Sequence, residues 1–260
     1  MDGVNRTLYI PLYGKALVSR KGILLHDPKA EEIWEMAGFS LKGKAASKWL
    51  AYYMAIRAGV MDSWTAEQIK KHPGAVVLHL GCGLDNRYGR LGSPDCRWFD
   101  VDMDEVIRER KRHYEETENY RMVAADLRSV DWLKEIVSGT AIVVMEGVSM
   151  YLRREELTDL LKRLNMHFSE VHLLMDCYSA FAARASKYKN PINEVGVTEV
   201  YGMDTPQALA KATGFRYVKQ HDMTPTAMIR ELATRERIVF SNLYAGRTAR
   251  SLYRLYEFEA

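Results

Sequence analysis

The sequence is poor in cysteine: it has three in 260 residues, and they lie far apart. They are Cys82, Cys96 and Cys177. An odd number at this spacing supports neither a disulfide framework nor a zinc site. The histidines suggest no metal either, because His72, His79 and His113 are scattered and form no ligand pair at helical spacing. We therefore expect a protein without a metal cofactor.

The chain also lacks long apolar runs and a strong charge. No stretch approaches the eighteen or so apolar residues that span a bilayer, and the amino terminus lacks the basic and apolar regions of a signal peptide. The formal net charge is only +3, and the most basic run, residues 108–113, is interrupted by Glu109 and predicts a solvated helix face. We expect a cytoplasmic protein that binds neither membranes nor nucleic acids. Its oligomeric state stays open.

The most informative segment is a short apolar run that ends in a glycine turn. Residues 76–80 (VVLHL) predict a buried strand. Gly81 and Gly83 follow, and without a Cβ they let the backbone turn tightly and approach a ligand closely. About twenty residues later a second apolar segment ends in Asp100 and Asp102, where a carboxylate can accept hydrogen bonds from both hydroxyls of a ribose. This spacing predicts a nucleoside site.

The third glycine of a dinucleotide-binding loop is missing. That loop has the pattern G-x-G-x-x-G and brings a helix N-terminus to a pyrophosphate. Here Asn86 takes the third position, and the bulky Arg87 and Tyr88 follow. This disfavours NAD, FAD and a nicotinamide-dependent oxidoreductase. S-adenosylmethionine, which has ribose and adenine but no phosphate, fits the pattern.

Apolar runs and helical periods alternate along the rest of the chain. After 76–80 we expect strands at 97–101, 121–124, 141–145, 171–175, 215–220 and 252–258, with helices at 104–116, 155–168 and 205–213. Such alternation is typical of a doubly wound α/β fold whose sheet is mostly parallel. The last two strands are predicted to form an antiparallel pair.

The chain is predicted to form a single domain, residues 1–260. Residues 1–73 are helix-patterned, with a clear apolar period over 45–58, and form an amino-terminal cap. Residues 74–260 form the cofactor-binding core, with an insertion near 180–204 over the active face. The role of residues 222–250 stays open.

Several motifs occur here in the order found in a known family. They are VLHLGCGLDNR at 77–87, FDVD at 99–102, Asp126-Leu127, EGVSMYL at 146–152, AIRA at 55–58, and Asp27-Pro28 with Ala30. From about residue 8 to 180 the chain resembles the class I S-adenosylmethionine-dependent methyltransferases. It is most similar to the leucine carboxyl methyltransferase group, which includes polyketide O-methyltransferases of the tetracenomycin type. Asn86 departs from the family pattern, which commonly has threonine there. The resemblance implies a Rossmann-like core with amino-terminal helices and an inserted lid.

The resemblance assigns cofactor contacts to the first two strand ends. Gly81, Cys82, Gly83 and Asp85 belong to the turn over which the methionine portion passes, with Cys82 as a small filler. The residues alone let either Asp100 or Asp102 bind the ribose, and the resemblance favours Asp102. The alternative role for Asp102 is capping the helix expected from residue 104.

Further contacts are implied at the next strand ends. Asp126 and Leu127 match the adenine position, where a carboxylate and a backbone N–H lie side by side; the alternative for Asp126 is an ordinary turn. Glu146 follows a buried run, and it would pair with the cofactor's ammonium, since an unpaired buried acid is costly.

The methyl-transfer end is assigned to Arg57 and Tyr151. Arg57, with weaker support from Lys15, would hold a carboxylate of the cofactor or the substrate; the alternative is a helix-surface arginine. Tyr151 would place its hydroxyl near the reacting methyl; the alternative is a core aromatic whose hydroxyl is already hydrogen-bonded.

These residues predict an O-methyltransferase that converts S-adenosyl-L-methionine to S-adenosyl-L-homocysteine. No His-Asp base pair stands out, and a carboxylate acceptor needs no base, so a carboxylate or an acidic hydroxyl of a small molecule is favoured. A protein C-terminal carboxyl methyltransferase and a non-catalytic cofactor-binding domain are the alternatives.

Overall fold

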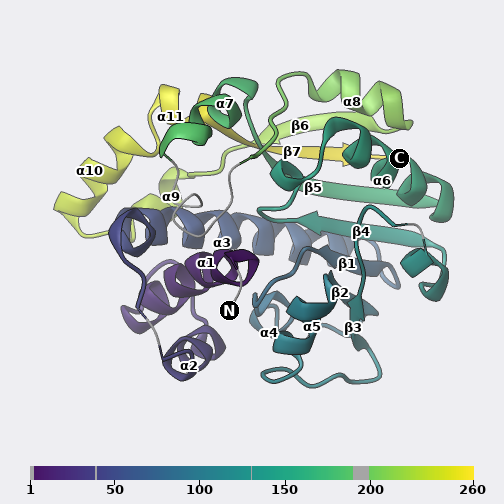
Figure 1. Cartoon of the computed structure of the whole chain (residues 1–260), viewed down its shortest axis with the longest axis horizontal. Coiled ribbons are helices and arrows are strands. Elements are labelled where there is room, and N and C mark those ends of the chain that lie inside the picture. The colour runs from purple at the N-terminus through teal and green to yellow at the C-terminus, as the bar shows by residue number, and fades with distance from the viewer. Residues whose placement is uncertain (1–2, 39, 130, 190–198) are drawn as a thin grey trace.

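The computed structural model describes residues 3–38, 40–129, 131–189 and 199–260. Within these ranges the chain forms a seven-stranded sheet with helices on both faces (Figure 1). The strands are β1 (Val76–Leu80), β2 (Trp98–Asp102), β3 (Tyr120–Ala124), β4 (Thr140–Met145), β5 (Glu170–Tyr178), β6 (Arg216–His221) and β7 (Tyr253–Glu259). Their order is β3-β2-β1-β4-β5-β7-β6. Strands β1 to β5 pair in parallel, and β7 is antiparallel to both β5 and β6, which confirms the predicted fold class.

The strand order reverses direction between β1 and β4. From β1 the chain builds outward through β2 and β3, whereas β4 starts the other half on the opposite side of β1. Leu80, the last residue of β1, is in register with Val101 of β2 and Met145 of β4. The next residues of all three strands therefore lie at one edge, at the kind of switch point where open α/β sheets bind ligands.

The sheet is buried on both faces because its strands are apolar on both faces. Leu78 points into a core shared with α6 (Arg154–His167) and α8 (Pro206–Thr213). Its neighbour Val77 points the other way, toward Trp64 of α3 (Lys48–Lys71) and Ile107 of α5 (Asp104–Arg110). Neighbouring side chains of a strand alternate between faces, so an unbroken apolar run indicates two covered faces.

Helix α3 is longer than its sequence period predicted. It spans 24 residues, about 36 Å at 1.5 Å per residue, whereas the apolar period indicated only 45–58. Residues 43–46 instead form the short 3-10 helix η1 (Gly43–Ala46). The helix continues past Ala58 because Met61 and Trp64 keep its sheet-facing side apolar and buried.

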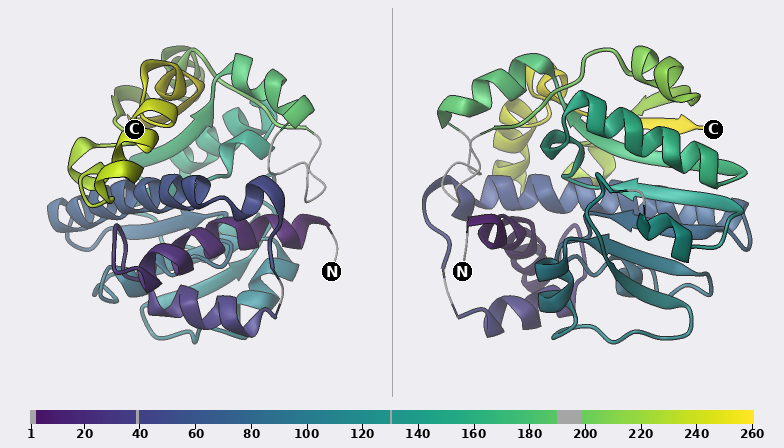
Figure 2. Two further views of the ribbon diagram at one scale, coloured as in Figure 1. Left: turned by 90° about the vertical axis from the view of Figure 1, so that its left-hand side faces the viewer. Right: turned by 45° about the vertical axis from the view of Figure 1, so that its right-hand side comes forward.

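Helices also gather at the carboxyl edge of the sheet. In Figure 2, left, α3 crosses the middle, with α1 (Gly3–Arg20) and α2 (Pro28–Met36) below it and the C-terminal helices above. These C-terminal helices are α9 (Thr226–Ile229), α10 (Thr234–Leu243) and α11 (Arg247–Leu252). The segment 222–250, whose role the sequence left open, is therefore largely helical. Of the predicted insertion near 180–204, the structure describes α7 (Ala180–Lys189) and residues 199–204; residues 190–198 lie outside the described ranges.

One predicted helix is too long. The helix expected over 104–116 ends at Arg110. Between Ile107 and Tyr114 the segment has only polar side chains, and a short helix needs packing to persist. The other predicted elements agree within a few residues, and β5 extends three residues further than expected.

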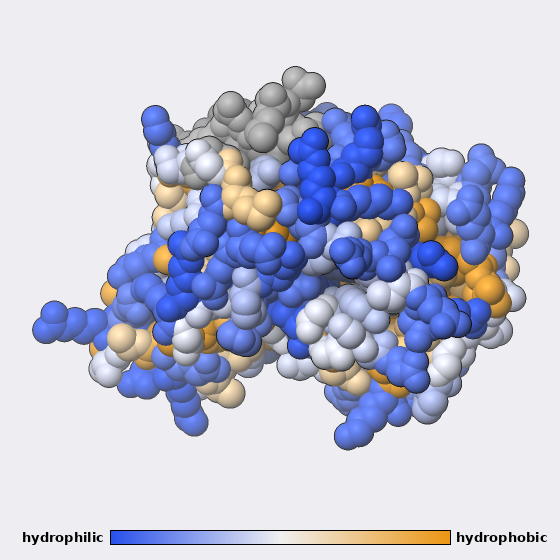
Figure 3. Space-filling view, turned by 90° about the horizontal axis from the view of Figure 1, so that it is seen from below, coloured by the Kyte–Doolittle hydropathy of each residue, from blue (hydrophilic) through white to orange (hydrophobic). Residues whose placement is uncertain are grey.

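The surface is largely polar on the face that lies at the bottom of Figure 1. Figure 3 shows this face as mostly hydrophilic, with hydrophobic residues in small groups. In the described part of the chain, the helices are too short or too polar to cross a membrane.

Candidate functional site

A cavity of about 680 Å³ opens at the carboxyl edge of the sheet, at the β1/β4 switch point. This volume suits a small-molecule site. Its lining contains every site residue predicted from the sequence: Lys15, Arg57, Gly81, Cys82, Gly83, Asp85, Asp102, Asp126, Leu127, Glu146 and Tyr151. The cavity therefore brings together residues from six separate segments, while their individual roles stay predictions.

The turn after β1 needs its glycines. Gly81 has φ +65°, and a Cβ there would overlap the side chain of Val148. Gly83 has φ +53°, and its N–H donates to Asp102 Oδ2 at 2.8 Å. Both glycines adopt the left-handed region that other residues avoid. The backbone itself therefore forms this wall of the cavity.

Asp102 braces the glycine turn. Its Oδ2 accepts from Gly83, its Oδ1 accepts from the Met103 N–H at 2.8 Å, and its carboxylate lines the cavity. Burial raises its pKa, and the two backbone hydrogen bonds oppose that shift. Helix α5 has Met103 as N-cap without a side-chain cap bond, so the alternative of Asp102 as a helix cap is wrong.

Asp100 is a structural residue. It is fully buried, pairs with Arg110, and accepts hydrogen bonds from Tyr120 (2.6 Å) and the Trp98 indole (2.9 Å). His79 Nδ1 lies 3.0 Å from the same carboxylate. Burial alone would raise the pKa of Asp100, but Arg110 and His79 lower it to about 2. Asp100 does not line the cavity, so of the two acids only Asp102 reaches a ligand there.

Arg110 was misplaced by the sequence analysis. The run 108–113 predicted a solvated helix face, yet Arg110 is buried. Its guanidinium donates to the carbonyl oxygens of Gly83 (3.0 Å) and Asp85 (2.7 Å) and so holds the glycine turn from below. The alternation of charges in the run does not reveal which basic residue faces inward.

Glu146 lies among three cations. Arg57 Nη2 donates to its Oε1 at 2.9 Å, Arg87 Nη2 donates to its Oε2, and Lys15 Nζ lies 3.6 Å from Oε1. Burial would raise the pKa of Glu146, but the charges of Lys15, Arg57 and Arg87 outweigh it and hold the pKa well below its usual range. Glu146 is therefore a carboxylate at any physiological pH.

The ion pairs continue away from Glu146 into the N-terminal cap. Lys15 of α1 pairs with Asp85 at 2.6 Å, and Asp85 pairs with Arg90 at 2.5 Å. Arg90 also pairs with Asp62 of α3 at 2.7 Å and with Asp27 at 2.8 Å. Asp27 is also the N-cap of α2, and its side chain accepts a hydrogen bond from the Ala30 N–H. The buried network therefore ties both N-terminal helices to the sheet edge.

Arg57 is the far end of this network. It is buried, and its Nη1 donates to the Tyr253 hydroxyl at 2.8 Å and lies 3.0 Å from Asp176 Oδ2. The alternative of a helix-surface arginine is therefore wrong. Its Nε is buried and has no hydrogen-bond partner among the described residues. Arg57 lines the cavity, and its Nη2 has a second N–H besides the one that it donates to Glu146.

Tyr151 is exposed to the cavity rather than packed in the core. Its relative exposure is 40%, and no hydrogen bond joins its hydroxyl to the described residues. The alternative of a core aromatic with a satisfied hydroxyl is therefore wrong. Burial of the hydroxyl end and the neighbouring Tyr178 raise its pKa, so the phenol stays protonated at neutral pH.

Aromatic side chains form a second part of the cavity lining. Tyr53, Tyr178, Tyr244 and Tyr253 line it together with Tyr151. Around them lie apolar side chains of α1, α3, α10 and α11, namely Ile10, Leu50, Met54, Leu243, Ala249 and Leu252. The sequence analysis missed this chamber, because its tyrosines come from distant segments and follow no motif.

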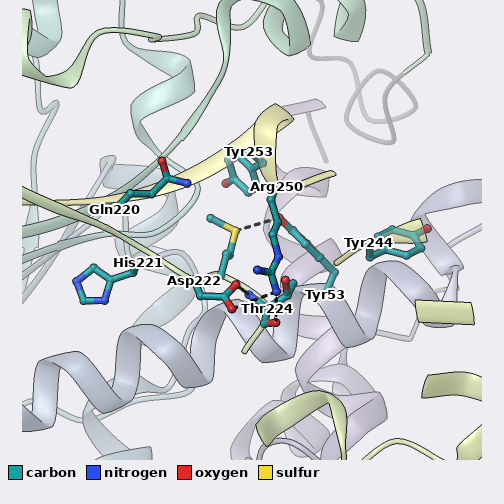
Figure 4. A pocket seen from close by; sticks show the side chains of 9 residues that line it. Tyr53, Gln220, His221, Asp222, Thr224, Tyr244, Arg250 and Tyr253 are labelled. Atoms are coloured by element: carbon teal, nitrogen blue, oxygen red, sulfur yellow. Dashed lines mark hydrogen bonds and ion pairs between the residues drawn. The ribbon is translucent and has the colours of Figure 1, made fainter. Parts of the chain in front are cut away.

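A smaller pocket of about 230 Å³ lies behind the tyrosines (Figure 4). Tyr53, Tyr244 and Tyr253 line both cavities. The Tyr53 hydroxyl donates to Met223 Sδ at 3.0 Å, and Arg250 pairs with Asp222 at 3.1 Å. This polar pocket marks the far side of the aromatic wall.

The histidine nearest the cavity is not available as a base. His79 lines its floor, but Nδ1 faces Asp100 and Nε2 lies 3.0 Å from Arg87 Nη1. Burial and the charge of Arg87 lower its pKa. Among the described residues that line the cavity, His79 is the one histidine.

Comparisons with known proteins point to one family. The family model "Leucine carboxyl methyltransferase" matches residues 6–165. The chain is 30% identical over 259 residues to the tetracenomycin polyketide synthesis O-methyltransferase TcmP of Streptomyces glaucescens, covering 98% of this chain and 96% of that protein. It is 25% identical over 242 residues to the S-adenosyl-L-methionine-dependent methyltransferase dpfgK of Gibberella zeae, covering 84% and 81%.

Two solved structures share the fold. A putative methyltransferase from Thermobifida fusca has a TM-score of 0.56 at 13% identity, covering 88% of this chain and 87% of that one. Magnesium protoporphyrin IX methyltransferase (ChlM) from Synechocystis with bound SAH has a TM-score of 0.53 at 13% identity, covering 88% and 92%.

The pKa of Asp100 predicts acid sensitivity. Because the folded pKa, about 2, is below the unfolded value of about 3.9, ionised Asp100 stabilises the fold above about pH 4. This contribution, roughly 2 kcal/mol, is lost as the pH falls from about 4 to 2. We expect the free energy of unfolding, measured by urea titration, to fall over this window. Asp100→Asn should flatten the fall, and an unchanged pH profile in that variant would contradict the assignment.

Proposed function

Because this chain belongs to the leucine carboxyl methyltransferase family and is an S-adenosylmethionine-dependent methyltransferase, we propose that it methylates an oxygen of a small aromatic molecule. The acceptor oxygen belongs to a carboxylate or an acidic hydroxyl. One observation carries the proposal: a single cavity joins the predicted cofactor residues to a chamber lined by tyrosines.

The part of the cavity around the glycine turn suits the cofactor. Backbone without a Cβ lines it at Gly81 and Gly83, and charged side chains of Arg57 and Glu146 line the same cavity. Asp102 would bind the ribose hydroxyls, Asp126 and the backbone of Leu127 the adenine. When bound, S-adenosylmethionine supplies a methyl group already activated by its positively charged sulfur.

The amino-acid end of the cofactor would face the ion network. Arg57 Nη2 has a second N–H besides the one that it donates to Glu146, and this N–H would donate to the cofactor's carboxylate. Glu146 is engaged by two guanidinium groups, but its two oxygens have about four acceptor sites, which leaves room for an ammonium. The linked network holds one more carboxylate than cations: Asp27, Asp62, Asp85, Glu146 and Asp176 against Lys15, Arg57, Arg87 and Arg90. A negative surplus favours a cofactor whose net charge is positive.

The tyrosine-lined part of the cavity suits an aromatic acceptor. Tyrosine rings offer flat apolar faces for stacking and edge contacts, and the Tyr151 hydroxyl has no hydrogen bond to the described residues. The relative TcmP is described as acting in tetracenomycin polyketide synthesis, and this supports a polyketide-like acceptor here by analogy. The enclosing helices α1, α3, α10 and α11 favour a small molecule over a protein terminus.

The residues present favour an acceptor that ionises without help. His79 is occupied, and the phenol of Tyr151 is held protonated. A carboxylate is already a nucleophile, and an acidic hydroxyl ionises readily, so alignment is the main requirement; it supplies up to about 7–11 kcal/mol. Tyr151 contributes by donating a hydrogen bond that orients the acceptor.

We expect S-adenosylhomocysteine to bind the purified protein and raise its melting temperature. At a hundred times its dissociation constant, a ligand of the folded state stabilises by about 2.7 kcal/mol. Thermal shift and calorimetry measure this, with NADH as the control ligand. A folded protein that does not respond to saturating S-adenosylhomocysteine would overturn the cofactor assignment.

Asp102→Ala should weaken binding of S-adenosylhomocysteine by tenfold or more, since charged hydrogen bonds contribute about 1.5–3 kcal/mol. Asp104→Ala is the matched control, because that acid is exposed on the first turn of α5 and pairs with Arg108. Calorimetry of both variants decides the matter: equal affinities would remove Asp102 from the ribose site.

Tyr151→Phe should lower kcat far more than it changes cofactor affinity, because orientation of the acceptor matters in the transition state. The rate is measured by labelled-methyl transfer to a panel of aromatic acids and phenols, with C-terminal peptides as a separate set. Tyr201→Phe, outside the cavity lining, is the control. An unaltered kcat, or transfer only to peptides, would contradict the proposal.

A further inference from the structure

We propose that His72, Glu170 and His172 form a binding site for a divalent transition metal, best matched by Zn²⁺. The three residues lie at the amino edge of the sheet, at the opposite end of the strands from the cavity. Glu170 begins β5, His172 follows two residues later, and His72 ends α3. This site is independent of the methyl-transfer chemistry proposed above.

The spacing of the three side chains supports the site. Each offers a ligand atom that lies within 4.8 Å of the other two. His172 Nε2 is 3.2 Å from Glu170 Oε1, and His72 Nδ1 is 4.0 Å from Glu170 Oε2. With bonds of about 2.0–2.2 Å to a tetrahedral Zn²⁺, ligand atoms are roughly 3.3–3.5 Å apart. Glu170 and His172 are already at this spacing, and the partly exposed His72 would turn out of its stacked position against the His172 ring to bind the same ion.

The buried ring of His172 lacks a well-aligned hydrogen bond at its Nε2. The residue is 6% exposed, and the acceptor beside Nε2 is Glu170 Oε1 at 3.2 Å, the proposed co-ligand, without hydrogen-bond alignment. Buried polar atoms without a partner are uncommon and costly. On the other side of the ring, Nδ1 lies 4.0 Å from Glu259 Oε1. A carboxylate beside the second nitrogen is typical of metal-binding histidines.

The donor set selects the class of ion. Two imidazoles and one carboxylate suit Zn²⁺ and its neighbours in the first transition row, whereas Mg²⁺ and Ca²⁺ prefer oxygen ligands throughout. The exposed Glu170 carboxylate leaves a path from solvent and a position for water. The three cysteines are buried elsewhere and do not compete.

The sequence does not reveal this site, for a reason that the fold explains. It contains no histidine pair at helical spacing here, but Glu170 and His172 are two apart on a strand and so share one face. His72 is brought to them by the end of α3, and the two imidazole rings lie 3.9 Å apart between centroids.

A metal here would join the two elements that meet at the cavity. Helix α3 carries Arg57 and ends at His72, and β5 carries both His172 and Asp176. The Arg57–Asp176 ion pair holds their upper ends together. About 22 Å lower along the helix, the metal would hold their other ends. It would therefore stabilise the fold and keep Arg57 in position without touching cofactor or acceptor.

The test is direct metal binding to the full chain after chelator treatment. Titration with ZnCl₂ should show one site by calorimetry and a higher melting temperature. CoCl₂ should give the visible absorption bands of a four-coordinate ion, which a merely structural histidine cluster does not produce. No saturable binding, or weak binding at several sites, would overturn the proposal.

Variants assign the ligands. His172→Gln should reduce Zn²⁺ affinity by more than about tenfold and abolish the cobalt bands, whereas His26→Gln, at an exposed position, should change neither. If His172→Gln does not fold, the more exposed His72→Gln and Glu170→Gln serve instead. Unchanged binding in these variants would overturn the assignment. Because the assay contains no cofactor or acceptor, its result is separate from that of the methyltransferase assays.

Discussion

A buried network of ion pairs is the constraint on which the rest of this structure depends. A charge removed from water is stable only beside an opposite charge, and removing one partner of a buried pair costs about 3–5 kcal/mol. Glu146 at the end of β4 and Asp85 after β1 can be buried only because Arg87, Arg90 and Lys15 are placed against them. The switch point of the sheet is therefore a charged site before any ligand enters it.

The same network explains why the N-terminal helices belong to the site. Lys15 comes from α1, Asp27 caps α2, and Arg57 and Asp62 lie on α3. Each provides a countercharge that the sheet lacks, and in doing so each helix is placed over the cavity. The wall that these helices form over the cavity thus depends on electrostatic pairing as well as on apolar packing.

Local features near the strand ends were predictable because they depend on few neighbours. An apolar run followed by two glycines determines a strand and a turn at 76–83 wherever it occurs. The acids Asp102, Asp126 and Glu146 follow strands, and parallel strands bring their carboxyl ends to one edge. From this order alone the fold class and the gathering of these residues around one cavity follow.

Tertiary structure alone decided which charges are buried and what the acceptor meets. Arg110 and Arg108 look alike in sequence, yet only Arg110 turns inward, because Asp100 lies beneath it. The chamber tyrosines come from α3, β5 and the 222–260 segment, and His72 meets His172 across 100 positions. Such contacts depend on how distant elements pack, whereas the spacing of residues along the chain records only which neighbours share a strand or a helical turn.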